Sequence, residues 1–112
     1  MAPNQDLFDI TSKVLLGLKE ILIVYKPDVV LVHGDTTTSM SASLAAFYLK
    51  IKVGHIEAGL RTNDLQSPWP EEMNRQVTDR ICDYYFVPTE LSKQILVNKK
   101  SIPKIYYSEF IK

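Results

Sequence analysis

Apolar residues recur every three or four positions in the first quarter of the chain. This spacing is that of one face of a helix, and over residues 6–25 it is kept by Leu7, Ile10, Val14, Leu18, Ile21 and Tyr25. Pro27 follows, and proline ends a helix because it lacks a backbone donor and clashes with the preceding turn. The pattern therefore predicts a helix over residues 6–25 that packs through this apolar face.

Short apolar runs alternate with helical segments in the rest of the chain. Residues 28–32 and 52–56 are predicted strands, and the β-branched run 28–32 is typical of a strand buried on both faces. Residues 39–50 form a predicted helix between them, with Thr36, Thr37 and Thr38 as candidate N-caps. A helix over residues 70–83, a strand over 84–87 and a helix over 89–98 follow. This alternation predicts an α/β fold with a parallel sheet and right-handed crossovers.

One long loop interrupts the alternation, at residues 58–70. A loop of this length inside a small domain is usually functional or disordered. It contains Leu65 and Trp69 among polar residues, prolines and a glycine, so we expect a packed loop with Trp69 as an anchor.

Composition excludes several classes of partner. The chain has 112 residues, which is enough for one domain at most. It contains 13 Lys+Arg and 13 Asp+Glu, so its formal net charge is zero. Balanced charge removes the general attraction to nucleic acid or anionic membranes. The apolar runs are far shorter than the ~20 residues that span a bilayer. We therefore expect no nucleic-acid or membrane partner and a cytoplasmic location.

The metal-ligating residue types are scarce. Cys82 is the only cysteine and is read as a buried apolar filler, and only His33 and His55 accompany it, so no zinc-type cluster is predicted. A weaker alternative is a divalent-ion site in which each histidine acts with the acidic residue two positions later, His33 with Asp35 and His55 with Glu57. Each histidine ends a predicted strand, where a partly buried, hydrogen-bonded imidazole is the simpler interpretation.

Acidic residues follow two of the predicted strands. Asp35 comes shortly after residues 28–32 and Glu57 comes directly after residues 52–56, so adjacent parallel strands would bring both to the sheet edge where ligands bind. Glu71, at the end of the long loop, is a third candidate. Grouped carboxylates provide a general acid beside a general base at neutral pH. Taken singly, each is also a common turn former or helix-capping residue.

Three longer strings carry more specific information. They are VHGDTT at residues 32–37, GHIEAGLRT at 54–62 and SPWPEEMNR at 67–75. In this order and spacing they closely resemble the non-hydrolysing UDP-N-acetylglucosamine 2-epimerases of bacteria. The resemblance implies one Rossmann-like half, with three α/β/α layers, of a two-domain glycosyltransferase-B arrangement. Residues 1–112 would be a partial N-terminal domain that lacks its first strand and the C-terminal domain.

The resemblance also implies a reaction. Family members interconvert UDP-N-acetylglucosamine and UDP-N-acetylmannosamine for surface polysaccharide synthesis, by eliminating UDP and adding it back, without a cofactor. By matching motif, Asp35, Glu57 and Glu71 would be the acid/base carboxylates. His55, Arg61 and Glu72 would then orient sugar or pyrophosphate, or contribute to an activator site.

The same resemblance sets expectations for assembly and activity. The family is expected to form homodimers, and a domain without its first strand is expected to self-associate or bind a partner through uncovered surfaces. Catalysis needs groups on both sides of the substrate, so the chain alone is expected to be inactive. Two alternatives are a non-catalytic α/β binding or assembly fragment and part of a glycosyltransferase of the same architecture. The string PWPEE favours the epimerase.

Overall fold

The computed structural model describes residues 5–59 and 61–87, and the backbone of residues 105–107. These residues form three helices, α1 (Leu7–Tyr25), α2 (Thr37–Tyr48) and α3 (Glu71–Ile81). They also form four strands, β1 (Val29–His33), β2 (Lys52–Ile56), β3 (Tyr84–Val87) and β4 (Ile105–Tyr107). The helix predicted over residues 89–98 lies outside the described residues.

The four strands form one parallel sheet in the order β1-β2-β3-β4. Val32 of β1 pairs with His55 of β2, and Ile56 of β2 pairs with Phe86 of β3. The predicted α/β fold and parallel sheet are therefore confirmed, and the carboxyl ends of β1 and β2 lie at one edge. β4 was not predicted, because three residues are too few for a clear period.

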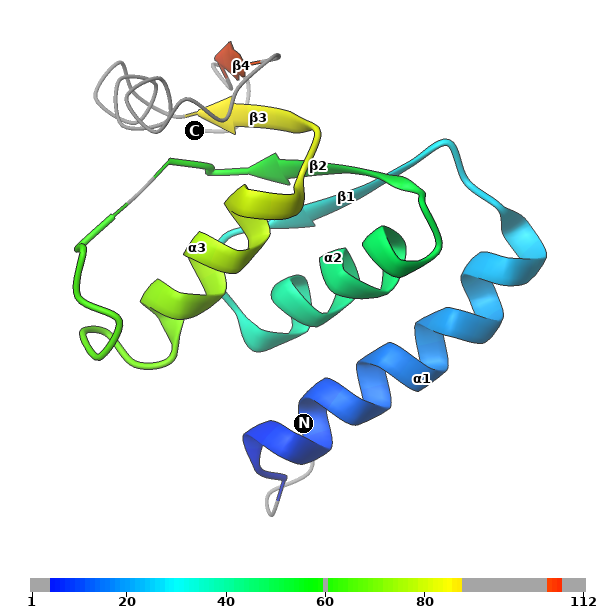
Figure 1. Ribbon diagram of the computed structural model, residues 1–112, viewed down its shortest axis with the longest axis horizontal. Helices are drawn as coiled ribbons and strands as arrows, with labels where there is room; N and C mark the ends of the chain where they lie inside the picture. The colour runs from blue at the N-terminus through cyan, green and yellow to red at the C-terminus, as the bar shows by residue number, and fades with distance from the viewer. Residues whose placement is uncertain (1–4, 60, 88–104, 108–112) are drawn as a thin grey trace.

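The described helices all lie on one face of the sheet (Figure 1). α2 packs against β1 and β2 through buried residues that include Ala45 and Ala46, α1 packs on α2, and α3 lies beside α2. Among residues 5–59 and 61–87, no helix covers the opposite face. The second helical layer of the predicted three-layer arrangement is therefore not found among them.

This one-sided cover corrects the prediction that the first strand is buried on both faces. Residues Val30 and Val32 point to the helices and pack in the core, whereas Leu31 is 58% exposed and Val29 is also exposed. Alternate strand residues point to opposite faces, so helices on one side bury only every second residue. Leu31 and Val29 line an open hollow of about 480 Å³ on the other side, together with Asp28, Lys52, Tyr84 and Phe86.

Helix α1 begins and ends as the sequence predicts, but its buried face is rotated. Asp6 caps the first turn by accepting a hydrogen bond from Asp9 N at 2.8 Å. Leu22 is buried, whereas Ile21 is 50% and Tyr25 78% exposed. The contact with α2 runs through Leu22 with Leu15 and Leu18, so the predicted face is wrong at its C-terminal end. None of the described helices is long and apolar enough to cross a membrane.

Helix α2 begins two residues earlier than predicted, at Thr37, because Thr36 is its N-cap. The Thr36 hydroxyl accepts a hydrogen bond from Ser39 N at 3.0 Å, which confirms that the threonine run caps the helix. Small buried side chains, Ser41, Ser43, Ala45 and Ala46, allow α2 to lie close to its neighbours.

The long loop is anchored by polar contacts rather than by its tryptophan. Trp69 is 60% exposed, so the prediction of a packing anchor is wrong. Instead, Thr62 Oγ1 donates to the carbonyl of Ser67, and Asn63 N donates to the Glu72 carboxylate at 3.1 Å. Cys82 is buried, as predicted.

Candidate functional site

The turns after β1 and β2 bring the Glu57 carboxylate next to Gly34, the residue that precedes Asp35. Gly34, which precedes Asp35, has a φ of 75° and donates its N–H to Ile56 O at 2.9 Å. A Cβ placed on Gly34 would lie 3.9 Å from Glu57 Oε2. The carboxylate of Glu57 therefore lies next to the turn that carries Asp35, and glycine suits the left-handed backbone of this turn.

Both carboxylates are accessible and face different partners. Glu57 Oε1 lies 3.3 Å from His33 Nε2, and the Glu57 side chain is 41% exposed. Asp35 Oδ2 lies 3.8 Å from Arg75 Nε, and the Asp35 side chain is 39% exposed. Both carboxylates are therefore partly open to solvent at the carboxyl ends of β1 and β2.

The two glutamates at the start of α3 differ in burial. Glu71 is the first residue of the helix and is partly exposed. Glu72 is fully buried and accepts hydrogen bonds from Asn63 N and from Gln76 Nε2, the latter at 2.9 Å. Glu72 therefore ties the long loop to α3.

The pKa of Glu72 is lowered despite its burial. Burial alone would raise the pKa, but the hydrogen bonds from Gln76 and from the backbone of residues 62–63, with the charge of Arg75, outweigh it. Arg75 Nε lies 3.5 Å from Glu72 Oε1 as well as near Asp35. Arg75 thus connects the buried Glu72 to the exposed Asp35.

Asn74 is a contributor to the site that sequence reasoning missed. Its side chain is buried, and its Nδ2 donates to Asp35 O at 3.0 Å and to Thr37 Oγ1 at 3.1 Å. These bonds attach α3 to the turn that carries Asp35. Its place inside the string SPWPEEMNR was the only signal that could have singled it out.

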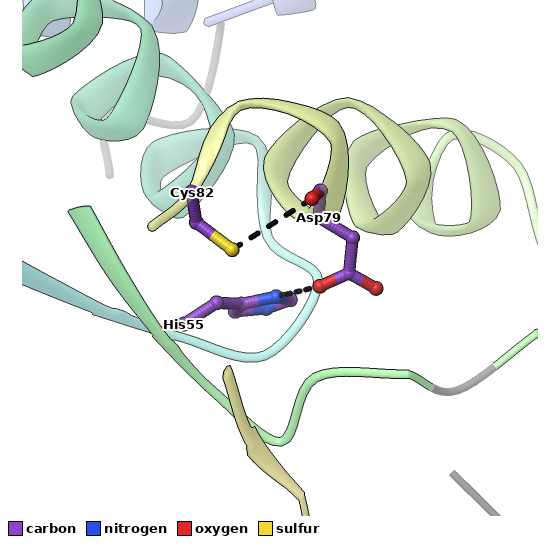
Figure 2. A group of neighbouring side chains, drawn as sticks. All are labelled: His55, Asp79 and Cys82. Atoms are coloured by element: carbon purple, nitrogen blue, oxygen red, sulfur yellow. Dashed lines mark hydrogen bonds and ion pairs between the residues drawn. The ribbon is translucent and has the colours of Figure 1, made fainter. Parts of the chain in front are cut away.

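A buried polar network lies beneath the two turns. His55 is fully buried, and its Nδ1 lies 2.5 Å from Asp79 Oδ1, the contact drawn as a dashed line in Figure 2. Its Nε2 lies 2.7 Å from Gly34 O. A carbonyl only accepts hydrogen bonds, and an ionised carboxylate does the same. Both ring nitrogens of His55 therefore face oxygen atoms, and the ring connects the Gly34 carbonyl to the Asp79 carboxylate.

The second oxygen of Asp79 binds the loop after β2. Oδ2 accepts from Gly59 N at 3.0 Å and from Arg61 NH1 at 2.7 Å, and the Arg61 side chain is almost fully buried. Burial alone would raise the pKa of Asp79, but the hydrogen bond and charge of His55, followed by those of Arg61, lower it. Sequence reasoning missed Asp79 because a helical aspartate late in α3 carries no strand-end signal.

Three side chains of this region have the residue types of a metal site. Potential ligand atoms of His55, Asp79 and Cys82 lie within 4.8 Å of one another (Figure 2). However, burial and the nearby charge of Asp79 raise the pKa of the Cys82 thiol, and the thiol donates to Asp79 O at 3.8 Å. Both ring nitrogens of His55 already lie within hydrogen-bonding distance of Asp79 and Gly34, so these residues form a hydrogen-bonded network.

Comparison with known proteins identifies the chain. The family model described as UDP-N-acetylglucosamine 2-epimerase matches residues 1–106. The chain belongs to this family. Curated epimerases of Yersinia pestis and Escherichia coli K12 are each 61% identical over 99 residues, which are 88% of this chain and 26% of each relative. The chain thus spans about a quarter of the length of these epimerases.

Solved epimerase structures share the fold. The Neisseria meningitidis UDP-GlcNAc 2-epimerase bound to UDP-GlcNAc is 55% identical with a TM-score of 0.90, covering 96% of this chain and 29% of that one. The Methanocaldococcus jannaschii enzyme in complex with UDP-GlcNAc and UDP is 42% identical with a TM-score of 0.86, covering 93% and 28%. The predicted epimerase-family relationship and Rossmann-like α/β fold are confirmed.

Proposed function

We propose that this chain carries acid/base carboxylates of a non-hydrolysing UDP-N-acetylglucosamine 2-epimerase. The observation that carries the proposal is the position of the Glu57 carboxylate next to Gly34, the residue that precedes Asp35. The family membership supports it, as do relatives solved with UDP-GlcNAc bound. The substrate pair would be UDP-N-acetylglucosamine and UDP-N-acetylmannosamine.

The proposed reaction needs two groups with different tasks. A base removes the proton from the carbon that bears the acetamido group as UDP leaves, and an acid returns a proton on the opposite face before UDP adds back. Asp35 faces the Arg75 guanidinium and Glu57 faces the His33 imidazole. Carboxylates with different neighbours are suited to separate acid and base roles. Glu71, at the N-terminus of α3, is the third proposed member of this set.

The residues assigned to substrate binding are proposed to act indirectly, from buried positions beneath the turns after β1 and β2. His55, Arg61 and Glu72 are buried and hold the turns and the loop in place. Their contribution to binding is therefore to orient the backbone and the carboxylates that the nucleotide sugar contacts.

The chain is proposed to supply one side of the substrate site. It would be part of an N-terminal Rossmann-like domain, and it spans about a quarter of the length of its epimerase relatives. Groups that reach the nucleotide sugar from the rest of such a protein are needed for turnover, because catalysis requires reacting groups fixed on more than one side. We therefore expect binding by this chain to exceed its catalysis.

A calorimetric titration with UDP-N-acetylglucosamine tests the proposal, with a parallel assay for the manno epimer. We expect saturable binding and no detectable conversion. Asp35→Ala and Glu57→Ala should each weaken binding about tenfold, since each removes a charged hydrogen-bonding group. Asp28→Ala, at the opposite end of β1, is the control and should bind as the wild type does. Absence of binding, or equal binding by all four proteins, would overturn the proposed site.

A further inference from the structure

We propose that Asp79 is a positioning residue that holds the turn of Asp35 and the loop of Glu57 in one fixed arrangement. This inference rests on the proposed function for its consequence in catalysis. The structural link itself is independent of any ligand.

The two oxygens of the Asp79 carboxylate serve the two turns separately. Oδ1 contacts His55, whose other ring nitrogen donates to Gly34 O, directly before Asp35. Oδ2 accepts from Gly59 N, two residues after Glu57. A single buried carboxylate therefore connects the segments that carry both proposed acid/base residues.

The charges of the network make these contacts strong. The Asp79 carboxylate lies between the buried His55 ring and the buried Arg61 guanidinium, a permanent cation. Hydrogen bonds to charged groups are shorter and stronger than neutral ones, and removal of one charge leaves its partners buried and uncompensated. The position of either turn is therefore coupled to the charge on Asp79.

Asp79 is itself held in place by β3. Tyr85 Oη donates to the Asp79 carbonyl at 2.7 Å, and Tyr85 is almost completely buried. The Asp79 side chain is 2% exposed. It does not reach a ligand at the sheet edge, so its effect on the reaction must pass through His55, Gly59 and Arg61.

The isosteric variant Asp79→Asn removes the charge while keeping the shape of the side chain. The matched control is Asp83→Asn: the Asp83 carboxylate also accepts a backbone hydrogen bond, from Val53 N at 2.9 Å. That bond lies near the start of β2, away from both turns. Each variant therefore removes one carboxylate charge. Asp79 contacts residues near the end of β2, whereas Asp83 contacts a residue near its start.

Nuclear magnetic resonance of the 112-residue chain gives the decisive readout. The Nδ1 signal of His55 should change in Asp79→Asn, because this variant replaces the carboxylate that Nδ1 contacts in the wild type. Hydrogen exchange at the Gly34 and Gly59 amides should accelerate together by about tenfold or more. Asp83→Asn should leave both amides and the His55 ring signals unchanged.

Three outcomes decide the inference. Joint acceleration with the change in the His55 ring supports the link. Acceleration at Gly59 alone, or unchanged exchange in a folded Asp79→Asn chain, overturns it. If Asp79→Asn fails to fold, the ring signals of the wild type still decide, because a His55 ring without a hydrogen-bonded proton between Nδ1 and Asp79 contradicts the proposed link.

The affinity for UDP-N-acetylglucosamine separates this inference from the proposed function. If the wild type binds, Asp79→Asn should bind about tenfold more weakly and Asp83→Asn equally well, whereas equal binding by Asp79→Asn contradicts the positioning role. If the wild type does not bind, the proposed function fails, and the amide exchange still decides whether Asp79 links the two turns.

Discussion

The guanidinium Nε of Arg75 lies 3.5 Å from Oε1 of Glu72, whose side chain is fully buried. The same nitrogen is 3.8 Å from the exposed carboxylate of Asp35. One side chain thus balances a buried charge that anchors the long loop and also faces a proposed catalytic carboxylate. Stability and site geometry depend on the same cation.

Replacement of Arg75 by an uncharged residue should lower the stability of the fold. Arg75→Met leaves the Glu72 carboxylate buried without its charged neighbour, and we expect a loss of about 2–4 kcal/mol in the free energy of unfolding. Arg80→Met, on the exposed side of α3, should change it by less than about 0.5 kcal/mol. Urea denaturation at neutral pH measures both, and equal small effects would show that Arg75 does not balance the charge of Glu72.

The lowered pKa of Glu72 predicts a loss of stability in acid. A carboxyl group with a folded-state pKa below its ordinary value of 4.5 stabilises the fold fully above that value. The contribution disappears as the pH falls through the folded-state pKa. Glu72→Gln should therefore be less stable than the wild type by about 1–3 kcal/mol at pH 7, and this difference should shrink at about pH 3.

Unfolding in urea at the two pH values tests this prediction. Glu20→Gln, on the exposed surface of α1, is the control and should match the wild type at both values. A difference between Glu72→Gln and wild type that stays constant with pH would mean that the Glu72 charge does not stabilise the fold.

Truncation of two neighbouring residues of α1 should destabilise the fold to very different extents. Leu22 is 5% exposed and packs in the core, so Leu22→Ala should cost about 2–5 kcal/mol. Ile21 is 50% exposed, and Ile21→Ala should cost less than about 1 kcal/mol. Thermal unfolding of the two variants checks which face of the helix is buried. A larger loss of stability for Ile21→Ala would mean that the face predicted from the sequence is the buried one.

This helix shows why the sequence predicts the elements better than their packing. The period of α1 and its stop before Pro27 are local, so its bounds were predicted within one residue. Which face is buried depends on α2, which the spacing of α1 does not describe. Glu57 and Asp35 could be proposed as candidates because the ends of strands can be predicted from the sequence. Asp79 was missed because its importance arises only when α3 packs on β2.

The open face of the sheet predicts self-association. Leu31 is 58% exposed there, beside Tyr84 and Phe86, and parallel sheets are normally covered on both faces. We expect the chain to form oligomers at micromolar concentration and Leu31→Lys to weaken them. Sedimentation velocity measures this, with Leu16→Lys on the exposed side of α1 as control. A monomer at all concentrations would contradict the prediction.

The most direct test of the whole account is an amide shift titration with UDP-N-acetylglucosamine. If the carboxyl ends of β1 and β2 hold the substrate, the amide signals of Asp35, Glu57 and Gly59 should shift saturably. The signals of Val29 and Lys52, at the amino ends of the same strands, should stay in place. Shifts confined to those amino ends, or no shifts at all, would contradict the assignment of this edge as the epimerase site.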